Sequence, residues 1–457
     1  MKSFLDYKES DLNLFTDFYE LAMCASYYDN NKNEPATFDL FIRNMPKNRS
    51  YFLFAGLEQV LLFLKNIKFT DKQLIYLKKH NFHTDFLNYL KNFEFTGDVW
   101  AVPEGSIVFQ NEPLIRITAP IIEAQLIETF LLNTINLQTM LATKASRVVN
   151  EAKGKPVIEF GLRREHGLDA GMKVARCSYI GGCKGTSNVL AGKCYDIPVF
   201  GTMAHSFIMS YRDELDAFRA FTKTFPNKTT LLIDTYDNIA GVNNAVVIGK
   251  ELENSGYNLG GVRIDSGNLT EISQQIRKIL DDNGLNYVKI FASGDLDEYR
   301  INNLLNNSAK IDVFGVGTKL GTSSDRPYLD VIYKLCEIRD EKGGFSAIMK
   351  LSEGKSTLPG RKQIYRYKNK KGYFDHDLIG LDNECLLGDP LLEKVIDEGK
   401  LIYNLPSLES IRNRAKENLR CLPAKYKALE SSPEYPVKLS QNLLDMIRRL
   451  TRKLKNE

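Results

Sequence analysis

The sequence predicts an α/β fold whose central part is an irregular parallel α/β barrel. Helical patterns such as Leu269–Asp282 and Leu296–Asn306 alternate with short apolar runs, and this alternation is typical of parallel sheets. Each apolar run leads into Gly, Asp or Ser, as strands do before a turn. The number of runs favours a barrel over an open sheet. The runs are Val157–Phe160, Ser178–Ile180, Val199–Phe200, Leu231–Ile233, Gly261–Ile264, Val288–Ala292 and Val313–Val316.

The N-terminal part mixes helical and strand patterns. Apolar and aromatic residues at helical spacing predict a helix over Asp11–Tyr28, and Ala36–Arg43 is expected to be a strand. Tyr51–Lys65 is expected to be a helix. Asp98–Pro120 combines short apolar runs with Gly and Pro, which predicts small strands joined by turns. Ile121–Ala152 is one long helical pattern.

The C-terminal part changes character again. Tyr328–Ile338, Ala347–Leu351 and Gln363–Tyr367 are typical of antiparallel strands joined by turns rich in Lys and Gly. Two basic amphipathic helices are expected over Ser407–Ala428 and Val437–Lys455. This part contains no motif that indicates chemistry.

Composition narrows the class of protein. The chain carries 61 basic and 57 acidic side chains, and a net charge of +4 is too small to indicate a nucleic-acid or membrane partner. Its cysteines form no CxxC pair and are scattered, which favours reduced thiols over a disulfide scaffold. The N-terminus lacks an apolar signal segment, and no apolar window is long enough to span a bilayer. We therefore expect a soluble cytoplasmic protein.

The predicted strand ends carry groups that bind phosphate. Ser293-Gly294-Asp295 and Gly315-Val316-Gly317-Thr318 combine small residues with exposed backbone N–H groups, which is a common way to cradle a phosphate. Arg163, Arg164 and Arg263 offer guanidinium groups for carboxylates or phosphates. With Asp265 and Asp295 to hold Mg²⁺, a polyphosphate substrate is plausible.

Each of these signals is weak by itself. Glycine-containing turns occur in every α/β fold, and one arginine at a strand end is more often part of a structural ion pair. Asp234 could cap a helix, and Lys184 could be a solvated loop charge. Core packing does not require polar groups at so many successive strand ends, so their repetition favours a site.

His205 has two possible roles. A neutral imidazole can attack a terminal phosphate and become phosphorylated. That role needs a carboxylate to orient the other ring nitrogen, and Asp234 is the candidate. Alternatively, His205 is a positive partner for pyrophosphate. The residues themselves leave both roles open.

Taken together, these motifs resemble nicotinate phosphoribosyltransferases over residues 10–340. Any one of the motifs is unspecific, but their order along the chain is distinctive. The segments that carry the resemblance are Thr16-Asp17-Phe18-Tyr19, Glu159-Phe160-Gly161-Leu162-Arg163-Arg164, Lys184-Gly185-Thr186-Ser187-Asn188, Gly201-Thr202-Met203-Ala204-His205-Ser206, Val262-Arg263-Ile264-Asp265-Ser266-Gly267, Ala292-Ser293-Gly294-Asp295 and Phe314-Gly315-Val316-Gly317-Thr318.

The resemblance implies a fold and an activity. Strands from residues 328–457 would complete an α+β domain formed by residues 1–140, with the barrel and its active site in residues 141–327. The enzyme would join nicotinate to 5-phosphoribosyl 1-pyrophosphate in NAD salvage, giving nicotinate mononucleotide and pyrophosphate. It would need Mg²⁺ and be an ATP-dependent, ligase-type enzyme that passes through a phosphohistidine. It would act as a homodimer with shared active sites.

The resemblance also implies roles for individual residues. His205 would be the phosphorylated catalytic residue, acting with Asp234 and Asp265. Nicotinate would lie between Phe160 and a tyrosine of the other subunit. The expected nicotinate-binding residues are Tyr19, Phe160, Ser187, Thr202 and Arg263. The expected phosphoribosyl pyrophosphate-binding residues are Arg163, Ser293, Gly294, Asp295, Gly315, Gly317 and Thr318.

Three alternatives remain. Nicotinamide phosphoribosyltransferases share the layout but carry an acidic residue where this chain has Ser187. A carboxylate there would repel nicotinate, since like charges ~4 Å apart cost about 1–4 kcal/mol, so Ser187 favours the acid over the amide. Quinolinate would demand more basic residues than these motifs provide. A binding protein without turnover would not need His205.

Overall fold

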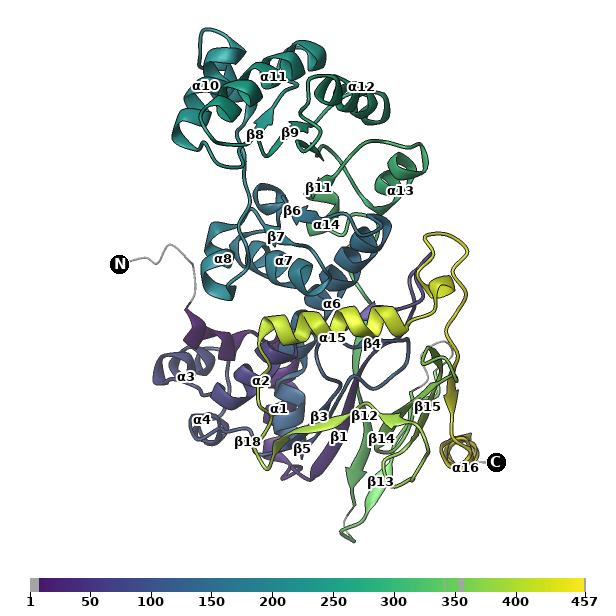
Figure 1. Ribbon diagram of the computed structural model, residues 1–457. Helices are drawn as coiled ribbons and strands as arrows, with labels where there is room; N and C mark the ends of the chain where they lie inside the picture. The colour runs from purple at the N-terminus through teal and green to yellow at the C-terminus, as the bar shows by residue number, and fades with distance from the viewer. Residues whose placement is uncertain (1–7, 341, 353–356, 456–457) are drawn as a thin grey trace. The chain divides into compact units, whose positions relative to one another are not determined.

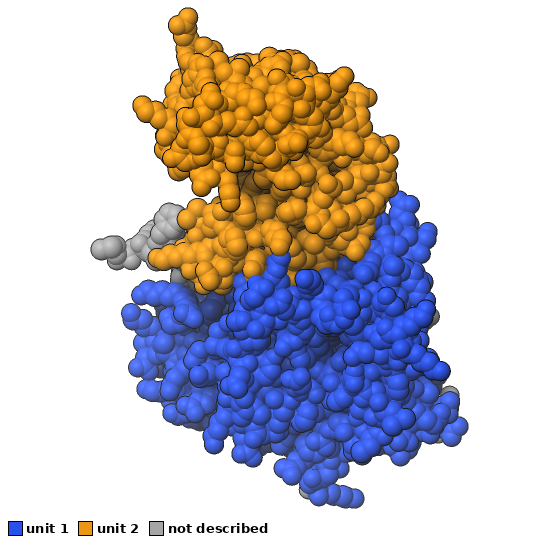
Figure 2. Space-filling view, viewed as in Figure 1, with its two compact units in different colours: residues 1–139, 328–457 blue, residues 140–327 orange. Residues whose placement is uncertain are grey.

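The computed structural model describes residues 8–340, 342–352 and 357–455. The chain divides into two compact units, residues 1–139 with 328–457 (unit 1) and residues 140–327 (unit 2), coloured blue and orange in Figure 2. The start of the chain, where no signal segment is expected, lies partly outside the described residues. Within those residues, no helix has both the length and the apolar character needed to cross a bilayer.

Unit 2 is built on a six-stranded parallel sheet with the order β7-β6-β11-β10-β9-β8. Helices alternate with the strands, and α10, α11 and α12 cover β8 and β9 in Figure 1. This arrangement confirms the predicted α/β class. The strands are β6 (Val157–Glu159), β7 (Gly185–Thr186), β8 (Thr230–Leu232), β9 (Gly261–Ile264), β10 (Lys289–Ala292) and β11 (Val313–Val316). The helices are η2 (Leu162–Arg164), α7 (Leu168–Ile180), α8 (Val189–Tyr195), α9 (His205–Met209), α10 (Glu214–Thr224), α11 (Asn238–Asn254), α12 (Leu269–Asp282), α13 (Glu298–Asn306) and α14 (Thr318–Gly321).

Two of the seven runs predicted as barrel strands do not form full strands: one is helical, and the other forms only a β-bridge. Ser178–Ile180 is the last turn of α7, because its buried residues continue the helical spacing of the preceding ones. A run of three residues is too short to separate a strand from the end of a helix. Val199–Phe200 contributes only an isolated parallel bridge between Val199 and Thr186. The strand that follows β6 is instead β7, which is two residues long.

Unit 1 contains a seven-stranded sheet with the order β13-β12-β1-β5-β3-β17-β18. The sheet joins distant parts of the chain, since β1 lies antiparallel to β5 on one side and to β12 on the other. Strands from the end of the chain thus complete a sheet begun near its start, which confirms the predicted α+β architecture. The strands are β1 (Pro35–Ile42), β3 (Asp98–Ala101), β5 (Ile115–Pro120), β12 (Val331–Arg339), β13 (Phe345–Ala347), β17 (Glu393–Asp397) and β18 (Lys400–Leu401).

A four-stranded sheet, β16-β14-β15-β19, and the antiparallel pair β2-β4 complete the β-structure of unit 1. In Figure 1 the C-terminal helix α16 lies beside β15. The strands are β2 (Phe52–Leu53), β4 (Ile107–Val108), β14 (Lys362–Lys368), β15 (Phe374–Leu381), β16 (Asp389–Pro390) and β19 (Val437–Leu439). The helices are η1 (Glu9–Leu14), α1 (Phe18–Asp29), α2 (Leu57–Asn66), α3 (Asp71–Lys78), α4 (Thr84–Lys91), α5 (Ile121–Leu126), α15 (Leu408–Cys421), η3 (Ala424–Tyr426) and α16 (Gln441–Lys455).

Several predicted helices in these parts are shorter than expected. The helix expected from residue 11 starts at Phe18, and the one expected from residue 51 starts at Leu57 after the short strand β2. The long helical pattern breaks at Ile127 into α5 and α6 (Glu128–Glu151). The boundary between the two units falls within α6. Residues 437–439, expected in the last helix, pair in parallel with β15.

Buried charges join the two larger sheets of unit 1. Lys362 on β14 lies 2.7 Å from the carboxylate of Asp39 on β1, and both side chains are almost fully buried. Arg116 on β5 donates to the backbone carbonyl of Lys362 at 2.7 Å and lies 3.5 Å from Asp382. Burial lowers the pKa of the Lys362 ammonium, but the charge and hydrogen bond of Asp39, with a contribution from Cys336, raise it above its ordinary value. A paired cation therefore fixes how β14 packs on β1.

Replacing Lys362 by Met should destabilise the protein by about 3–5 kcal/mol, because Asp39 would remain as a buried charge without its partner. Lys368 lies on the same strand and forms an ion pair with Asp389 that is largely exposed. Lys368→Met is therefore the matched control and should cost at most about 1 kcal/mol. The measurement is chemical unfolding of both variants, and equal losses would contradict the expected contrast.

Candidate active site

A cavity of about 650 Å³ opens at the carboxyl ends of the strands of unit 2. This is the edge at which parallel α/β sheets bind ligands. Every predicted site residue except Tyr19 and Asp234 lines it. Those residues are Phe160, Arg163, Ser187, Thr202, His205, Arg263, Asp265, Ser293, Gly294, Asp295, Gly315, Gly317 and Thr318. Arg164, expected as an anion-binding guanidinium, also lines it, whereas sequence reasoning gave no individual role to the other lining residues, which are Leu162, Gly201, Met203 and Ala204.

The turn after β10 is held tightly against the turn after β9. The hydroxyl of Ser293 donates to the carboxylate of Asp265 at 2.6 Å. Gly294 has a φ of +89°, and a Cβ atom there would lie 2.0 Å from the carbonyl oxygen of Asp265. Only glycine fits this position, since both the conformation and the space exclude a side chain. Asp295, the next residue, also has a positive φ of 50°.

The ring of Phe160 lies over Gly315. A Cβ atom on Gly315 would be 2.5 Å from this ring, so the absence of a side chain on β11 allows the aromatic ring its place. The backbone N–H of Phe160 donates to the carbonyl of Val316 at 2.9 Å, which fixes the start of the turn after β6. Phe160 thus provides an apolar, flat wall in a cavity that is otherwise rich in polar groups.

Glu159 organises the turn that carries Arg163 and Arg164. Its side chain is buried and accepts hydrogen bonds from the backbone N–H of Gly161 and from the hydroxyl of Thr186 on β7. Burial raises the pKa of this carboxyl group. The two arginines on η2 are exposed to the cavity side and are left available for anions. The sequence gave no sign of this supporting role of Glu159.

Glu165 is an unusual neighbour of this turn. Both of its carboxyl oxygens are buried and have no hydrogen-bond partner. The group lies against two glycines, because a Cβ atom would meet Oε1 at 2.1 Å on Gly161 and at 1.9 Å on Gly321. Burial, and then the charge of Glu159, raises the pKa of Glu165 to about 8. Glu165 is therefore largely protonated at neutral pH.

Arg263 presents a partly buried guanidinium group to the cavity. Its Nη1 donates to the hydroxyl of Thr202, while its Nε is buried without a partner. Burial lowers the pKa of Arg263, and the charges of Asp265 and Asp234 oppose this shift. An arginine remains charged under these conditions, so this cation is well suited to bind a carboxylate.

His205 is the first residue of α9 and lines the cavity. Its Nδ1 lies 3.1 Å from the hydroxyl of Thr235, not beside the carboxylate of Asp234. Asp234 instead accepts from the backbone N–H of Asp265 at 2.7 Å and from the hydroxyl of Ser266 at 2.9 Å. The predicted pairing of Asp234 with the imidazole is therefore corrected to Thr235. Asp234 holds the turn after β9, and its other oxygen is buried without a partner.

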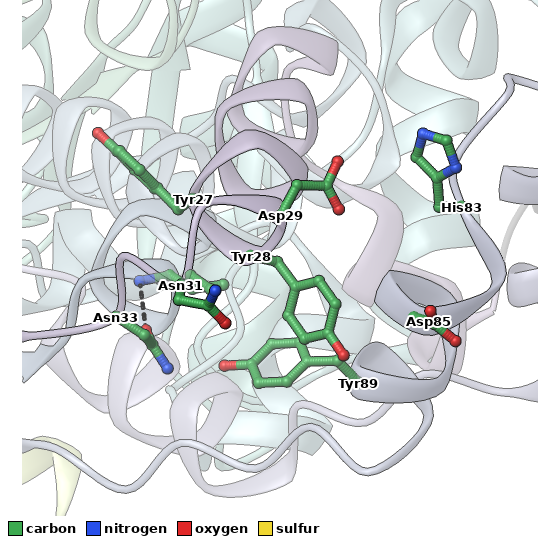
Figure 3. Close-up of a pocket in the computed structure, with 9 residues that line it drawn as sticks. Tyr27, Tyr28, Asp29, Asn31, Asn33, His83, Asp85 and Tyr89 are labelled. Atoms are coloured by element: carbon green, nitrogen blue, oxygen red, sulfur yellow. Dashed lines mark hydrogen bonds between the residues drawn. The ribbon is translucent and has the colours of Figure 1, made fainter.

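Tyr19 belongs to α1 of unit 1, and its side chain is 52% exposed. Unit 1 has a hollow of its own, shown in Figure 3, where Tyr28 and Tyr89 lie side by side with ring centroids 5.4 Å apart. Asp29 and Asp85 line this hollow, and no lysine or arginine does. Among the described residues that line this hollow, two carboxylates and His83 are the ionisable groups besides the tyrosines, so it offers no permanent cation to a phosphate or carboxylate, and the cavity of unit 2 is the candidate active site.

Models of a known family match three parts of the chain. The nicotinate phosphoribosyltransferase N-terminal domain matches residues 14–136, the family's central model matches residues 156–343, and its C-terminal domain matches residues 387–447. A nicotinate phosphoribosyltransferase of Mycobacterium tuberculosis is 46% identical, and the alignment covers 96% of this chain and 93% of that protein. The chain belongs to the nicotinate phosphoribosyltransferase family.

Two further relatives carry the same family name, and a third structure of another name shares the fold. A nicotinate phosphoribosyltransferase of Bacillus subtilis is 40% identical, with 95% of this chain and 94% of that protein covered. The crystal structure of human nicotinic acid phosphoribosyltransferase superposes with a TM-score of 0.84 at 28% identity and covers 95% of this chain and 99% of that one. A nicotinate-nucleotide pyrophosphorylase from Pyrococcus furiosus gives a TM-score of 0.76 at 26% identity, with 92% of this chain and 98% of that one covered. The family resemblance seen in the motifs is thus confirmed.

Glu165 should make the stability of the protein depend on pH. Its carboxyl group has a pKa of about 8 in the folded state and the ordinary pKa of 4.5 in the unfolded chain. Between these values the folded state binds the extra proton, so the free energy of unfolding falls as the pH rises. Glu165→Gln removes this loss and should be more stable than the wild type at about pH 8 by on the order of 1 kcal/mol, after allowance for solvent screening.

The advantage of Glu165→Gln should vanish near pH ~4.5, where the carboxyl group is protonated in both states. Chemical unfolding at several pH values measures it. The exposed Glu271 on α12 supplies the matched control, since Glu271→Gln makes the same change on a solvated helix face. A stability difference that stays constant with pH would contradict the proposed titration of Glu165.

Proposed function

We propose that the protein transfers the phosphoribosyl group of 5-phosphoribosyl 1-pyrophosphate to nicotinate, giving nicotinate mononucleotide and pyrophosphate in NAD biosynthesis. One observation carries the proposal: a single cavity is lined by a partly buried guanidinium, an aromatic ring and two glycine-containing turns. Nicotinate requires a cation for its carboxylate and a flat surface for its ring, and the phosphate groups require the turns and Arg163. Family membership supports the same activity.

The proposed reaction is a displacement at C1 of the ribose. The lone pair of the pyridine nitrogen forms a bond to C1, and the C1–O bond to pyrophosphate breaks with its electron pair leaving on the oxygen. The ring nitrogen of nicotinate carries no proton, so the step needs no base. Arg263 and Thr202 would orient the carboxylate, and Phe160 would hold the ring. The contribution of the protein is positioning and the stabilisation of charge on the leaving group.

Mg²⁺ would neutralise charge on the departing pyrophosphate. Asp265 and Asp295 carry the carboxylate oxygens that Mg²⁺ prefers, and both line the cavity. Among the described residues, no group of three or more metal-binding side chains converges. We therefore propose that the cation enters with the pyrophosphate and takes few ligands from the protein, as is usual for Mg²⁺ bound to phosphates.

We also propose that ATP acts through His205. Its imidazole would attack the γ-phosphorus of ATP, the bond to the ADP oxygen would break, and hydrolysis of the resulting phosphohistidine would later release phosphate. The position of His205 in the cavity and its contact with Thr235 support this role. Thr235, rather than Asp234, would fix the ring orientation.

Tyr19 would complete the nicotinate site in a homodimer. Phe160 is the only aromatic residue among the described residues that line the cavity, so one face of a bound ring would remain uncovered. Phe18 and Tyr19 are more than half exposed on α1. We propose that α1 of a second copy supplies Tyr19.

All seven cysteines are free thiols in the structure, which supports the reducing cytoplasm as the location of this enzyme.

The decisive experiment compares nicotinate with nicotinamide as substrates of the purified protein, with 5-phosphoribosyl 1-pyrophosphate and Mg²⁺. Formation of nicotinate mononucleotide, with nicotinamide used far more slowly, is the expected result. Ser187, which lines the cavity, favours this preference because it brings no negative charge toward the carboxylate. A protein that binds the mononucleotide in calorimetry but turns over neither base would refute the proposal.

Arg263→Met should lower kcat/KM for nicotinate by about 10- to 100-fold, the usual loss for a hydrogen bond to a charged group. The value for nicotinamide should change little, since this base has no carboxylate to pair. Arg219→Met is a control for the loss of one positive charge, because Arg219 forms an exposed ion pair with Glu251 on the outer helices. An equal loss for both bases would contradict a carboxylate contact.

His205→Ala should abolish the stimulation by ATP while turnover without ATP continues, so that the ratio of the two rates falls to about 1. The reason is that only the imidazole can accept the γ-phosphoryl group. The measurement is the initial rate of mononucleotide formation with and without ATP, together with the release of ADP. Stimulation that persists in the variant would remove the phosphohistidine from the mechanism.

A further inference from the structure

Lys319 links the turns that follow β10 and β11. It lies on α14, directly after the cavity residue Thr318, but its side chain does not line the cavity. Its Nζ is 3.2 Å from a carboxylate oxygen of Asp295 and 3.1 Å from one of Asp297. These hydrogen bonds and the two negative charges raise the pKa of Lys319. One ammonium group thus joins two carboxylates behind the site.

Asp297 is a rigid point of attachment for this lysine. Its other carboxylate oxygen caps α13 by accepting from the backbone N–H of Arg300 at 2.8 Å. The next residue, Glu298, is fully buried and pairs with Lys144 at 2.6 Å and with Arg147 at 3.1 Å. The first turn of α13 is therefore fixed by a capping bond and by buried ion pairs.

Asp295, by contrast, needs support. It lies in the left-handed region with a φ of 50°, which residues with a side chain adopt rarely, and its side chain is two-thirds exposed. The side chain of Arg300 steadies the same turn from behind by donating to the carbonyl of Gly294 at 3.2 Å. Lys319 and Arg300 are the charged groups that hold this turn from outside the cavity.

Without the ammonium group of Lys319, the carboxylates of Asp295 and Asp297 would face each other with no cation between them. The capped and anchored Asp297 cannot move, so repulsion would displace Asp295 and the turn that it shares with Gly294. Both of these residues line the cavity. The effect would reach a substrate bound to this turn and leave the nicotinate pocket around Arg263 unchanged.

We propose that Lys319 is a positioning residue for phosphoribosyl pyrophosphate. It acts through Asp295 and does not touch the substrate. The inference rests on the proposed function, because it names the substrate whose affinity the lysine sets.

The test compares Lys319→Met with Lys319→Arg by steady-state kinetics. Lys319→Met should raise KM for phosphoribosyl pyrophosphate about tenfold, with KM for nicotinate and kcat changed by less than about threefold. Lys319→Arg retains the cation and should restore most of the affinity. Lys310→Met removes the same charge from an exposed position of unit 2 and should leave all constants unchanged.

A double-mutant cycle separates positioning from direct contact. Asp297→Asn keeps an oxygen for the helix cap but loses the charge that binds Lys319, and it should raise the same KM. Combined with Lys319→Met it should not raise this KM further and should partly restore it, because the charge that repels Asp295 is then gone. Full additivity, an equal rise of KM for both substrates, or an equal effect of Lys310→Met would overturn the proposal.

Calorimetry keeps this inference separate from the proposed function. Binding of phosphoribosyl pyrophosphate alone should weaken about tenfold in Lys319→Met. Weakened binding in the variant, with no turnover of nicotinate by the wild type, would support the role of Lys319 and refute the proposed function. Unchanged binding in the variant, with normal turnover by the wild type, would refute the role of Lys319 and support the proposed function.

Discussion

Parallel hydrogen bonding within the sheet of unit 2 is the constraint on which the site depends. β9, β10, β11 and β6 are neighbours in this order, and all point the same way. Their final residues therefore emerge at one edge, and the turns that follow them meet there. Residues spread over about 160 positions of the chain, from Phe160 to Thr318, line one cavity for this reason. No single segment could supply a guanidinium, an aromatic ring and two phosphate-binding turns within one volume.

The cavity edge is then fixed by carboxylates that take no part in the proposed chemistry. Glu159 holds the turn with Arg163, Asp234 holds the turn after β9, and Asp297 fixes the first turn of α13. Each accepts a backbone N–H close to a strand end or helix start. Preorganisation of this kind is useful when a protein acts by positioning rather than by covalent participation. The same logic explains why so many acidic residues occur beside a site for anions.

The sequence revealed much of this arrangement, and its failures have physical causes. β9 and β11 have the predicted bounds because each lies between clear turn residues. The prediction of a strand at Ser178–Ile180 is wrong because a three-residue run has no measurable periodicity. The partner of His205 was assigned wrongly because Asp234 and Thr235 are adjacent at one strand end. Which of them faces the imidazole depends on the neighbouring strand, where the N–H of Asp265 engages Asp234. The burial of Glu165 could not be predicted, because a carboxylate beside two arginines in the sequence usually forms an exposed ion pair with one of them.

The pairing of β1 with β12 has a consequence for how the chain matures. Ala36 lies opposite Ile338, so about 300 residues must be synthesised between the two halves of this central pair. Unit 2 forms the inserted segment, and all its strands leave the ribosome before β12 does. While unit 2 is made, β1 can already pair with β5, but its other edge has no partner strand until β12 leaves the ribosome. Closing so long a loop is slow, and the rate at which newly made chains reach the native state should depend on this late step.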